Sequence, residues 1–458
     1  MKTFWNLNDL KQALKKSSEI SYWKIETDTI HRYETYLMKD FKTNEVFSDQ
    51  KREVIEKKIR VWILIFLNEN QCGEFSSDWS LYKDLNSQLE NAIEIAKNAK
   101  KKKWIPEFNL QKSTNPPYSC DPDIKSNLTL NASAIENEIV KKINEKNREN
   151  FNSCELFVSY HQKKFIFSND KSFTHDQSRI YFDLAYSSQN NNKSDEFNLR
   201  RWFVHKDQID LNSLFDHTIH CAQAIVKATL PKAHSYPVLF DEEVLCTLFH
   251  DLITHLQSSQ KYDQLPFKEK GEFLIPEAKG DLIDLSIDPH DPFGADTIGF
   301  SQQGYPQKPQ IFVVKNQIKS NITAEPYSQY LDHTLTTTRG TLTVSPGKKS
   351  KAELLKQSTS VLEIFQLSGL FTDAATGTFS SEIRLGCIHH PDGSKQWIKG
   401  GSISGSLSEN LTRAEFSSET ARFSEFTSEK HTDGGPSPLS YNGPRYILFN
   451  EVPVASSL

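Results

Sequence analysis

The sequence lacks the features of an exported or membrane-spanning protein. Its six cysteines are scattered over 458 residues and none forms a CxxC pair, which fits a reducing cytoplasm better than a disulfide framework. The amino terminus, MKTFWNLNDLKQ, has no hydrophobic signal core, so we expect no export. The longest apolar run, VWILIFL at residues 61–67, is far too short to span a bilayer and predicts a buried strand.

The sequence also lacks an excess of positive charge. Its net charge of -5 gives no electrostatic reason to expect nucleic acid as a partner. Hydrophobic residues make up 37% and charged residues 25%, which are ordinary values for a globular chain. A chain of 458 residues is longer than a domain with a single hydrophobic core usually is, so we expect two domains.

The amino-terminal half alternates between helical and strand-like patterns. Helices are expected within residues 80–103, near residues 135–147 and over residues 211–230, with Lys100 to Lys103 at the carboxyl end of the first. The segments CELFVSY, KKFIFS and RIYFDLAY predict strands, and SSQNNNKSDE at residues 187–196 predicts a mobile loop. We place a domain boundary at Pro231, which gives a mixed α/β domain over residues 1–230.

The carboxyl-terminal half, residues 231–458, is dominated by short strands and glycine turns. IRLGCIHHPDGSKQWIKGG predicts a hairpin whose turn is Pro391-Asp392-Gly393. Ser350 and Glu353 form a capping box, from which we expect a helix with Leu354, Leu355, Val361, Leu362 and Phe365 on its buried side. The fold class expected for the whole chain is therefore α+β, with a β-rich carboxyl-terminal domain that carries one helix with a chemical motif.

That motif is FHDLITHL, residues 249–256. Asp241 is the expected N-cap, and the helix that follows carries His250, Asp251 and His255. On a regular helix, residues five apart point about 140° away from each other, so His250 and His255 would not hold one ion. A single π-bulge between them would return both to one side, and such bulges are frequent at functional sites. Metal binding therefore predicts a distorted helix here.

Taken alone, the spacing leaves two interpretations open: a metal site, or a polar helix face that holds two histidines. His217 and His220 form a similar pair on the preceding helix, and we interpret them as structural or exposed. His389 and His390 are adjacent in a strand, where side chains alternate between faces, so they are a poor chelate.

The surroundings of the motif resemble the TldD/PmbA family of intracellular metallopeptidases and their companion subunits. PVLFDEEVLCTLFHDLITHL resembles the family's strand leading into an HExxxH helix. QGYPQKPQIFVVKNQIKSN and TLTVSPGKKSKAELLKQ resemble a strand pair and a capped helix, and LSGLFTDAATGTFSSEIRLGCIHHPDGSKQWIKGGSISGSLSENL is the most specific match. The resemblance extends from Pro237 to about Asn450, whereas the amino-terminal half has little motif content.

The resemblance implies a role for each residue of the motif. His250 and His255 fall on the two metal-binding histidines, and Asp251 falls on the general-base glutamate. His431, in SEKHTDGGPSP, takes the place of the family's third ligand, a cysteine. Imidazole replaces thiolate as a zinc (Zn2+) ligand in many proteins, and iron is the alternative metal. Two departures weaken catalysis: aspartate is one methylene shorter than glutamate, and Ser301-Gln-Gln-Gly304 stands where the family often has acidic residues.

The function that the resemblance implies is a cytoplasmic metallopeptidase that hydrolyses unfolded or short peptides through a metal-activated water. Family members form dimers, so we expect a homodimer or a heterodimer with a relative. The alternative is a catalytically inactive companion subunit that completes a peptidase dimer. Neither interpretation involves nucleic acid or a membrane.

Overall fold

The computed structural model describes residues 5–40, 42–108, 110, 119–146, 148–190, 193–426, 431–432, 435–436 and 438–456, the two short pairs as backbone only. Within them the chain is α+β with sheets in both halves, which confirms the predicted fold class. No described helix combines the length and the apolar character needed to cross a membrane.

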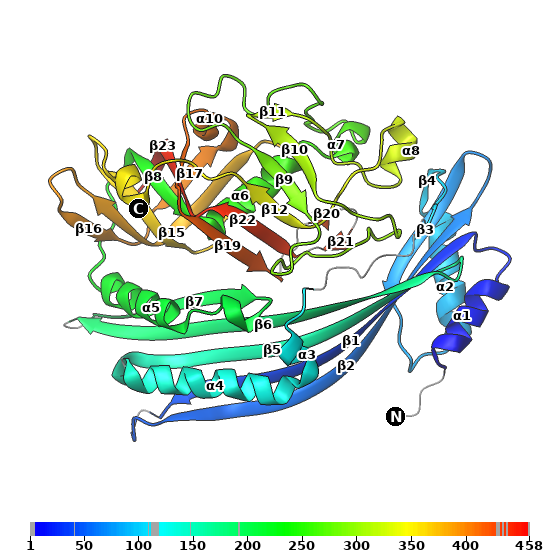
Figure 1. Cartoon of the computed structure of the whole chain (residues 1–458), viewed down its shortest axis with the longest axis horizontal. Helices are drawn as coiled ribbons and strands as arrows, with labels where there is room; N and C mark the ends of the chain where they lie inside the picture. The colour runs from blue at the N-terminus through cyan, green and yellow to red at the C-terminus, as the bar shows by residue number, and fades with distance from the viewer. Residues whose placement is uncertain are drawn as a thin grey trace.

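The amino-terminal half is built on one long antiparallel sheet (Figure 1). Its strand order is β4-β3-β2-β1-β5-β6-β7. The strands are β1 Tyr22–Lys39, β2 Val46–Phe66, β3 Gln71–Asp78, β4 Lys100–Lys102, β5 Phe151–Phe167, β6 Ser172–Asn190 and β7 Lys193–Phe203. Apolar residues of the predicted strand VWILIFL lie in β2, where Val61 to Ile65 are buried.

Helices cover this sheet at both ends. The helices α4 (Leu128–Glu145) and α5 (Leu211–Ile225) share one core with β1, β5, β6 and β7. The helices α1 (Leu7–Lys16) and α2 (Leu85–Asn98) share another with β1, β2 and β3. Figure 1 shows α4 and α5 along one end of the sheet and α1 and α2 at the other.

Two large sheets and one two-stranded pair, β20 (His431–Thr432) with β21 (Gly435–Pro436), form the carboxyl-terminal half. The six-stranded sheet has the order β11-β10-β9-β12-β22-β19, and the eight-stranded sheet follows the path β13-β8-β23-β17-β15-β14, with β16 beside β15 and β18 beside β23. A single apolar core includes residues of both sheets and of α6 (Glu242–Thr254). The bounds are β8 His234–Asp241, β9 Leu285–Asp288, β10 Gln310–Val314, β11 Gln317–Ile318, β12 Thr341–Val344, β13 Val361–Leu367, β14 Phe371–Asp373, β15 Thr378–His389, β16 Lys395–Ile398, β17 Ser402–Ser406, β18 Glu415–Phe416, β19 Thr420–Glu425, β22 Leu439–Pro444 and β23 Tyr446–Ala455.

Short helices complete the fold between these strands. They are α3 Pro122–Ser126, α7 Ser258–Tyr262, α8 Tyr327–Leu331, α9 Lys351–Leu355 and α10 Leu407–Leu411, with the 3-10 turns η1 Arg148–Asn150 and η2 Lys206–Gln208.

Several local predictions are confirmed and others are wrong. The hairpin of β15 and β16 turns at residues 390–394, and the Ser350–Glu353 capping box is present. The helix it opens stops at Leu355, however, and residues 361–367 form β13 because they complete a sheet with β8 and β15. Lys100 to Lys102 form β4 rather than a helix end, and most of residues 187–196 lie in the β6–β7 hairpin rather than a mobile loop.

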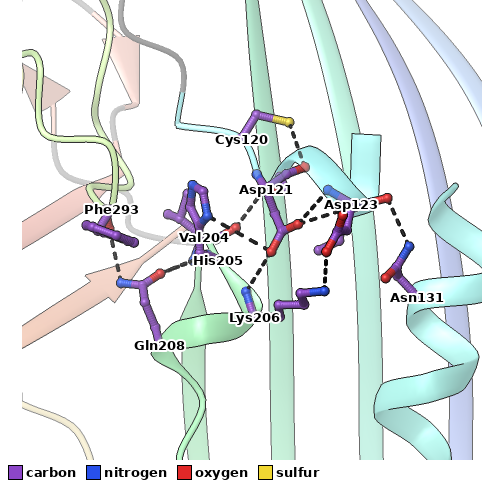
Figure 2. Close-up of polar contacts among 11 residues, drawn as sticks. Cys120, Asp121, Asp123, Asn131, Val204, His205, Lys206, Gln208 and Phe293 are labelled. Carbon is purple, nitrogen blue, oxygen red and sulfur yellow. Dashed lines mark hydrogen bonds and ion pairs between the residues drawn. The ribbon is translucent and has the colours of Figure 1, made fainter. Parts of the chain in front are cut away.

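A buried aspartate, Asp121, joins the short helix α3 to the 3-10 turn η2, which follows β7 (Figure 2). One carboxylate oxygen of Asp121 accepts the backbone N–H groups of Asp123 and Ile124, at 2.9 and 3.2 Å, and so caps α3. The other oxygen accepts the backbone N–H of Lys206 at 3.0 Å. The side chain of Gln208 then donates to the carbonyl of Phe293, at 3.3 Å, in the carboxyl-terminal half.

Candidate functional site

The motif-bearing helix α6 begins where the sequence predicts. Asp241 adopts an extended conformation as N-cap and its side chain accepts the N–H of Val244, and Glu242 and Glu243 occupy the first turn. The apolar residues that follow are buried: Val244, Leu245, Leu248, Phe249, Leu252 and Ile253. The helix contacts β19 and β22 of one sheet and β8, β14 and β23 of the other. The helix therefore lies in the core between the two sheets.

The carboxyl end of α6 contradicts the predicted π-bulge. Residues 242–254 form an uninterrupted α-helix, and His255 is its C-cap with helical backbone angles. The next amides make 3-10-type bonds, from His255 N to Leu252 O at 3.3 Å and from Leu256 N to Ile253 O at 2.9 Å. A 3-10 turn has fewer residues per turn than an α-helix, so it rotates His255 further from His250 rather than back toward it. The prediction that the helix widens between the histidines is therefore wrong.

The first histidine has an orientation that suits a metal ligand. Nδ1 of His250 lies 2.7 Å from the carbonyl oxygen of Cys246, one turn earlier in the helix. A carbonyl only accepts, so this contact places the proton on Nδ1 and the lone pair on Nε2, the atom that a metal would contact. Ligating histidines commonly have their other nitrogen held in this way.

The second histidine is held differently. Nε2 of His255 contacts the carbonyl oxygen of Ala374, in the turn between β14 and β15. The contact places the proton on Nε2, so this nitrogen is occupied by the protein. Asp251, between the two histidines, is only 5% exposed, so its carboxylate is buried.

The predicted third ligand lies in a part of the chain described only as backbone. His431 and Thr432 form a two-residue strand, β20, paired with Gly435–Pro436, β21, and the side chain of His431 is outside the described residues. Within the part of the chain that the structure describes, no group of three histidine, cysteine, aspartate or glutamate side chains is arranged to hold a metal. The assignment of His250, His255 and His431 as ligands and Asp251 as base stays a prediction.

The motif residues therefore fit a metal only in part. His250 has a ligand's tautomer, whereas His255 directs Nε2 to Ala374. The described residues supply one oriented imidazole, and one imidazole does not form the three-ligand set of a catalytic zinc site.

The other two histidine pairs make structural contacts, which settles for His217 and His220 which of the two alternatives, structural or exposed, holds. The ring of His217 stacks on Phe365, and His220 contacts Trp397 edge-on, so both pack between α5 and the carboxyl-terminal half. Burial lowers the pKa of His217 to about 4, which keeps it neutral. His389 bonds to Glu363 at 2.8 Å and His390 to Ser360 at 2.8 Å, so these neighbours serve different partners.

The amino-terminal sheet also carries a charged layer, Lys163, His175 and Arg179, which the sequence does not reveal because apolar residues dominate the pattern of its strands. Lys163, His175 and Arg179 lie on β5 and β6, on the face that meets the carboxyl-terminal domain. Their spacing in KKFIF and THDQSR gives a weak signal, since charged residues at alternate strand positions usually mark a solvated face.

Comparisons with known proteins agree with this architecture. The sequence profile of the PmbA/TldA metallopeptidase C-terminal domain matches residues 233–456. A candidate modulator of DNA gyrase from Bacteroides thetaiotaomicron aligns with a TM-score of 0.73 at 12% identity, TldE from Thermococcus kodakarensis with 0.71 at 14%, and a candidate modulator of DNA gyrase from Thermotoga maritima with 0.70 at 14%. Each alignment covers 98% of this chain and 99% of the other. No curated protein sequence matches the chain.

The fold and the motif-bearing helix define a two-domain protein with a metallopeptidase-type carboxyl-terminal domain. Residues 233–456 match the PmbA/TldA metallopeptidase C-terminal domain, which confirms the resemblance to the TldD/PmbA family predicted from the sequence. The family profile covers the carboxyl-terminal half, and the solved structures share the fold over nearly the whole length.

Proposed function

We propose that this chain is a catalytically inactive TldD/PmbA-like companion subunit that completes a peptidase dimer. The observation that carries the proposal is the contact of His255 Nε2 with the carbonyl of Ala374, which directs one of the two motif histidines to the protein itself. Two further features support it. Asp251 stands where the family has its general-base glutamate, and its side chain is buried.

Such a subunit supplies part of the lining of a peptide-binding site that it shares with an active relative. An extended, unfolded peptide is the ligand that suits exposed sheet edges, because its backbone pairs with them and its side chains are read only weakly. The edge strand β14, beside His255, offers such an edge: it pairs with β15 on one side. The pocket next to it, of about 560 Å³, is lined by residues of β14, β15, β17, α10 and β23.

A metallopeptidase with zinc, or with iron as the alternative, is the second candidate, and one observation favours it. The bond from His250 Nδ1 to the Cys246 carbonyl gives Nε2 the lone pair that a ligand needs. In that case His250, His255 and His431 would hold the metal, which would supply an activated water, and Asp251 would accept that water's proton.

Elemental analysis and peptidase assays separate the two candidates. The purified chain should contain no stoichiometric zinc or iron after reconstitution, and it should not hydrolyse unfolded peptides. Asp251→Glu should not create activity, while co-purification with a TldD/PmbA relative that keeps HExxxH should give an active heterodimer. One metal per chain that is lost in His250→Ala, together with hydrolysis by the chain alone, would overturn the companion-subunit proposal.

A further inference from the structure

Cations gather on one face of the amino-terminal sheet, between that sheet and the carboxyl-terminal domain. Asp28 of β1, Lys163 of β5 and His175 of β6 are direct cross-strand neighbours, so their side chains share a face. Arg179 lies four residues beyond His175 on β6 and therefore on the same face. Gln177, between them, donates to the carbonyl of Ala295 at 2.7 Å, which places this face against the carboxyl-terminal domain.

The two cations on this face have few acidic neighbours. Among the described residues, no group accepts a hydrogen bond from the Lys163 ammonium, and the carboxylates near it are Glu26 and Asp28. Asp28 already bonds to His161 Nδ1 at 3.1 Å. Burial, and then the charge of Arg179, lower the pKa of Lys163. A cation in such a place is costly unless an anion joins it.

The guanidinium of Arg179 is held in place without a carboxylate bonded to it. Its Nε donates to Gln177 at 3.0 Å, and its carbon lies 4.5 Å from the centre of the Phe426 ring. Burial lowers the pKa of Arg179 to about 10, so it stays charged at neutral pH. A positioned guanidinium of this kind suits the planar, two-oxygen geometry of a carboxylate.

An unsatisfied histidine lies beside the cations. His175 is 3% exposed, and its Nδ1 has no hydrogen-bond partner among the described residues. Burial, and then the charges of Lys163 and Arg339, lower the pKa of His175 to about 3, so the ring is neutral. A buried ring nitrogen with no partner is rare in native proteins and points to a ligand or water at that position.

We propose that Lys163, His175 and Arg179 form an anion site that holds the carboxyl-terminal carboxylate of a peptide. The site rests on the proposed function in that the peptide is the one taken up by the dimer. Phe426, which covers Arg179, is five residues before His431 in the sequence. Lys163 and Arg179 remain partly exposed, which leaves them within reach of a ligand from solvent.

Titration calorimetry with tetra-alanine tests the site without any need for catalysis. The free-acid peptide should bind the full-length chain at least about tenfold more tightly than its carboxyl-terminal amide, because charge-assisted hydrogen bonds are lost in the amide. Equal binding of the two peptides, or no binding of either, would overturn the proposal. Inorganic phosphate is the third ligand: if it binds more tightly than the free acid and displaces it, the site takes phosphate and the peptide assignment is wrong.

Two variants and one control test whether the preference for the free-acid peptide arises at this site. Arg179→Gln and Lys163→Met should each abolish the preference for the free acid, whereas Lys164→Gln, the adjacent exposed lysine on the opposite face, should keep it. Lys163→Met should also unfold at a higher temperature than the parent without ligand, because a half-buried cation with no hydrogen-bond acceptor among the described residues is removed. Retained preference in both site variants would overturn the proposal. Heterodimer formation should survive in them, so failure of this site and failure of the companion role are distinguishable.

Discussion

His255 Nε2 contacts the carbonyl oxygen of Ala374, which joins the end of α6 to the turn after the edge strand β14. His250 Nδ1 contacts the carbonyl of Cys246, within the same helix. The two histidines of one sequence motif therefore have different tasks. One fastens two structural elements together, and the other has the orientation of a ligand.

The His255 contact predicts that its removal affects stability more than metal content. His255→Ala should lower the free energy of unfolding by about 1–2 kcal/mol, because a hydrogen bond is lost and the Ala374 carbonyl loses its donor. Urea unfolding measures the change, and elemental analysis after incubation with zinc should show the same low metal content in variant and parent. A stoichiometric metal that disappears in the variant would contradict this prediction.

The hydrogen bonds of Asp121 predict that replacing it costs far more stability than replacing its neighbour Asp123 (Figure 2). Asp121→Ala leaves the backbone N–H groups of Asp123, Ile124 and Lys206 without their acceptor and should destabilise the protein by about 3 kcal/mol. Asp123→Ala removes only an exposed ion pair with Lys206 and should cost under about 0.5 kcal/mol. Chemical denaturation compares them, and equal losses would show that these hydrogen bonds do not support the fold.

The sequence predicted the features that local physics controls. The Asp241 N-cap, the Ser350–Glu353 capping box and the turn at Pro391 each depend on residues within a few positions of one another. The sequence predicts a helix through residues 361–365, whereas residues 361–367 form a strand, because its pairing with β8 and β15 involves residues far away in the sequence. Tertiary pairing outweighed the helical spacing of its apolar residues.

The candidate site shows the same division. The family resemblance located His250 and His255, but the tautomer of each depends on carbonyls at Cys246 and Ala374, and Ala374 is 119 residues from His255. Lys163, His175 and Arg179 come together only because β5 and β6 pair in one register. A shift of one residue would move one strand's side chains to the other face, so no motif in the sequence could reveal this layer.

The close approach of α2 to the sheet gives a prediction on packing. A Cβ atom added at Gly73 in β3 would lie 1.8 Å from the carbonyl oxygen of Ala96, so Gly73→Ala should destabilise the protein by about 3 kcal/mol. Gly393, in the β15–β16 turn, has a φ of 86° but open space around it, so Gly393→Ala should cost about 1 kcal/mol. Thermal unfolding should rank the two in this order, and the reverse order would show that α2 moves away freely.

Two buried histidines, His161 and His175, lie on the face of the sheet that carries Lys163 and Arg179, and they predict a loss of stability in mild acid. Burial lowers the pKa of His161 to about 4 and that of His175 to about 3, whereas an unfolded histidine has a pKa of about 6.5. The unfolded chain binds these protons first as the pH falls, so the stability is fully present above pH 6.5 and is lost below it. Each histidine should contribute up to about 1.4 kcal/mol per pH unit.

Urea unfolding at pH 7.0, 6.0 and 5.0 measures this slope while most carboxylates remain ionised. His175→Gln keeps a neutral polar side chain at this position. It should lower the change in the free energy of unfolding per pH unit by the contribution of one histidine. His234→Gln, at an exposed position on β8, is the matched control and should leave the slope unchanged. If His175→Gln has the slope of the parent, the His175 ring takes up a proton equally well in the folded and unfolded states. The folded structure would then not lower the pKa of His175.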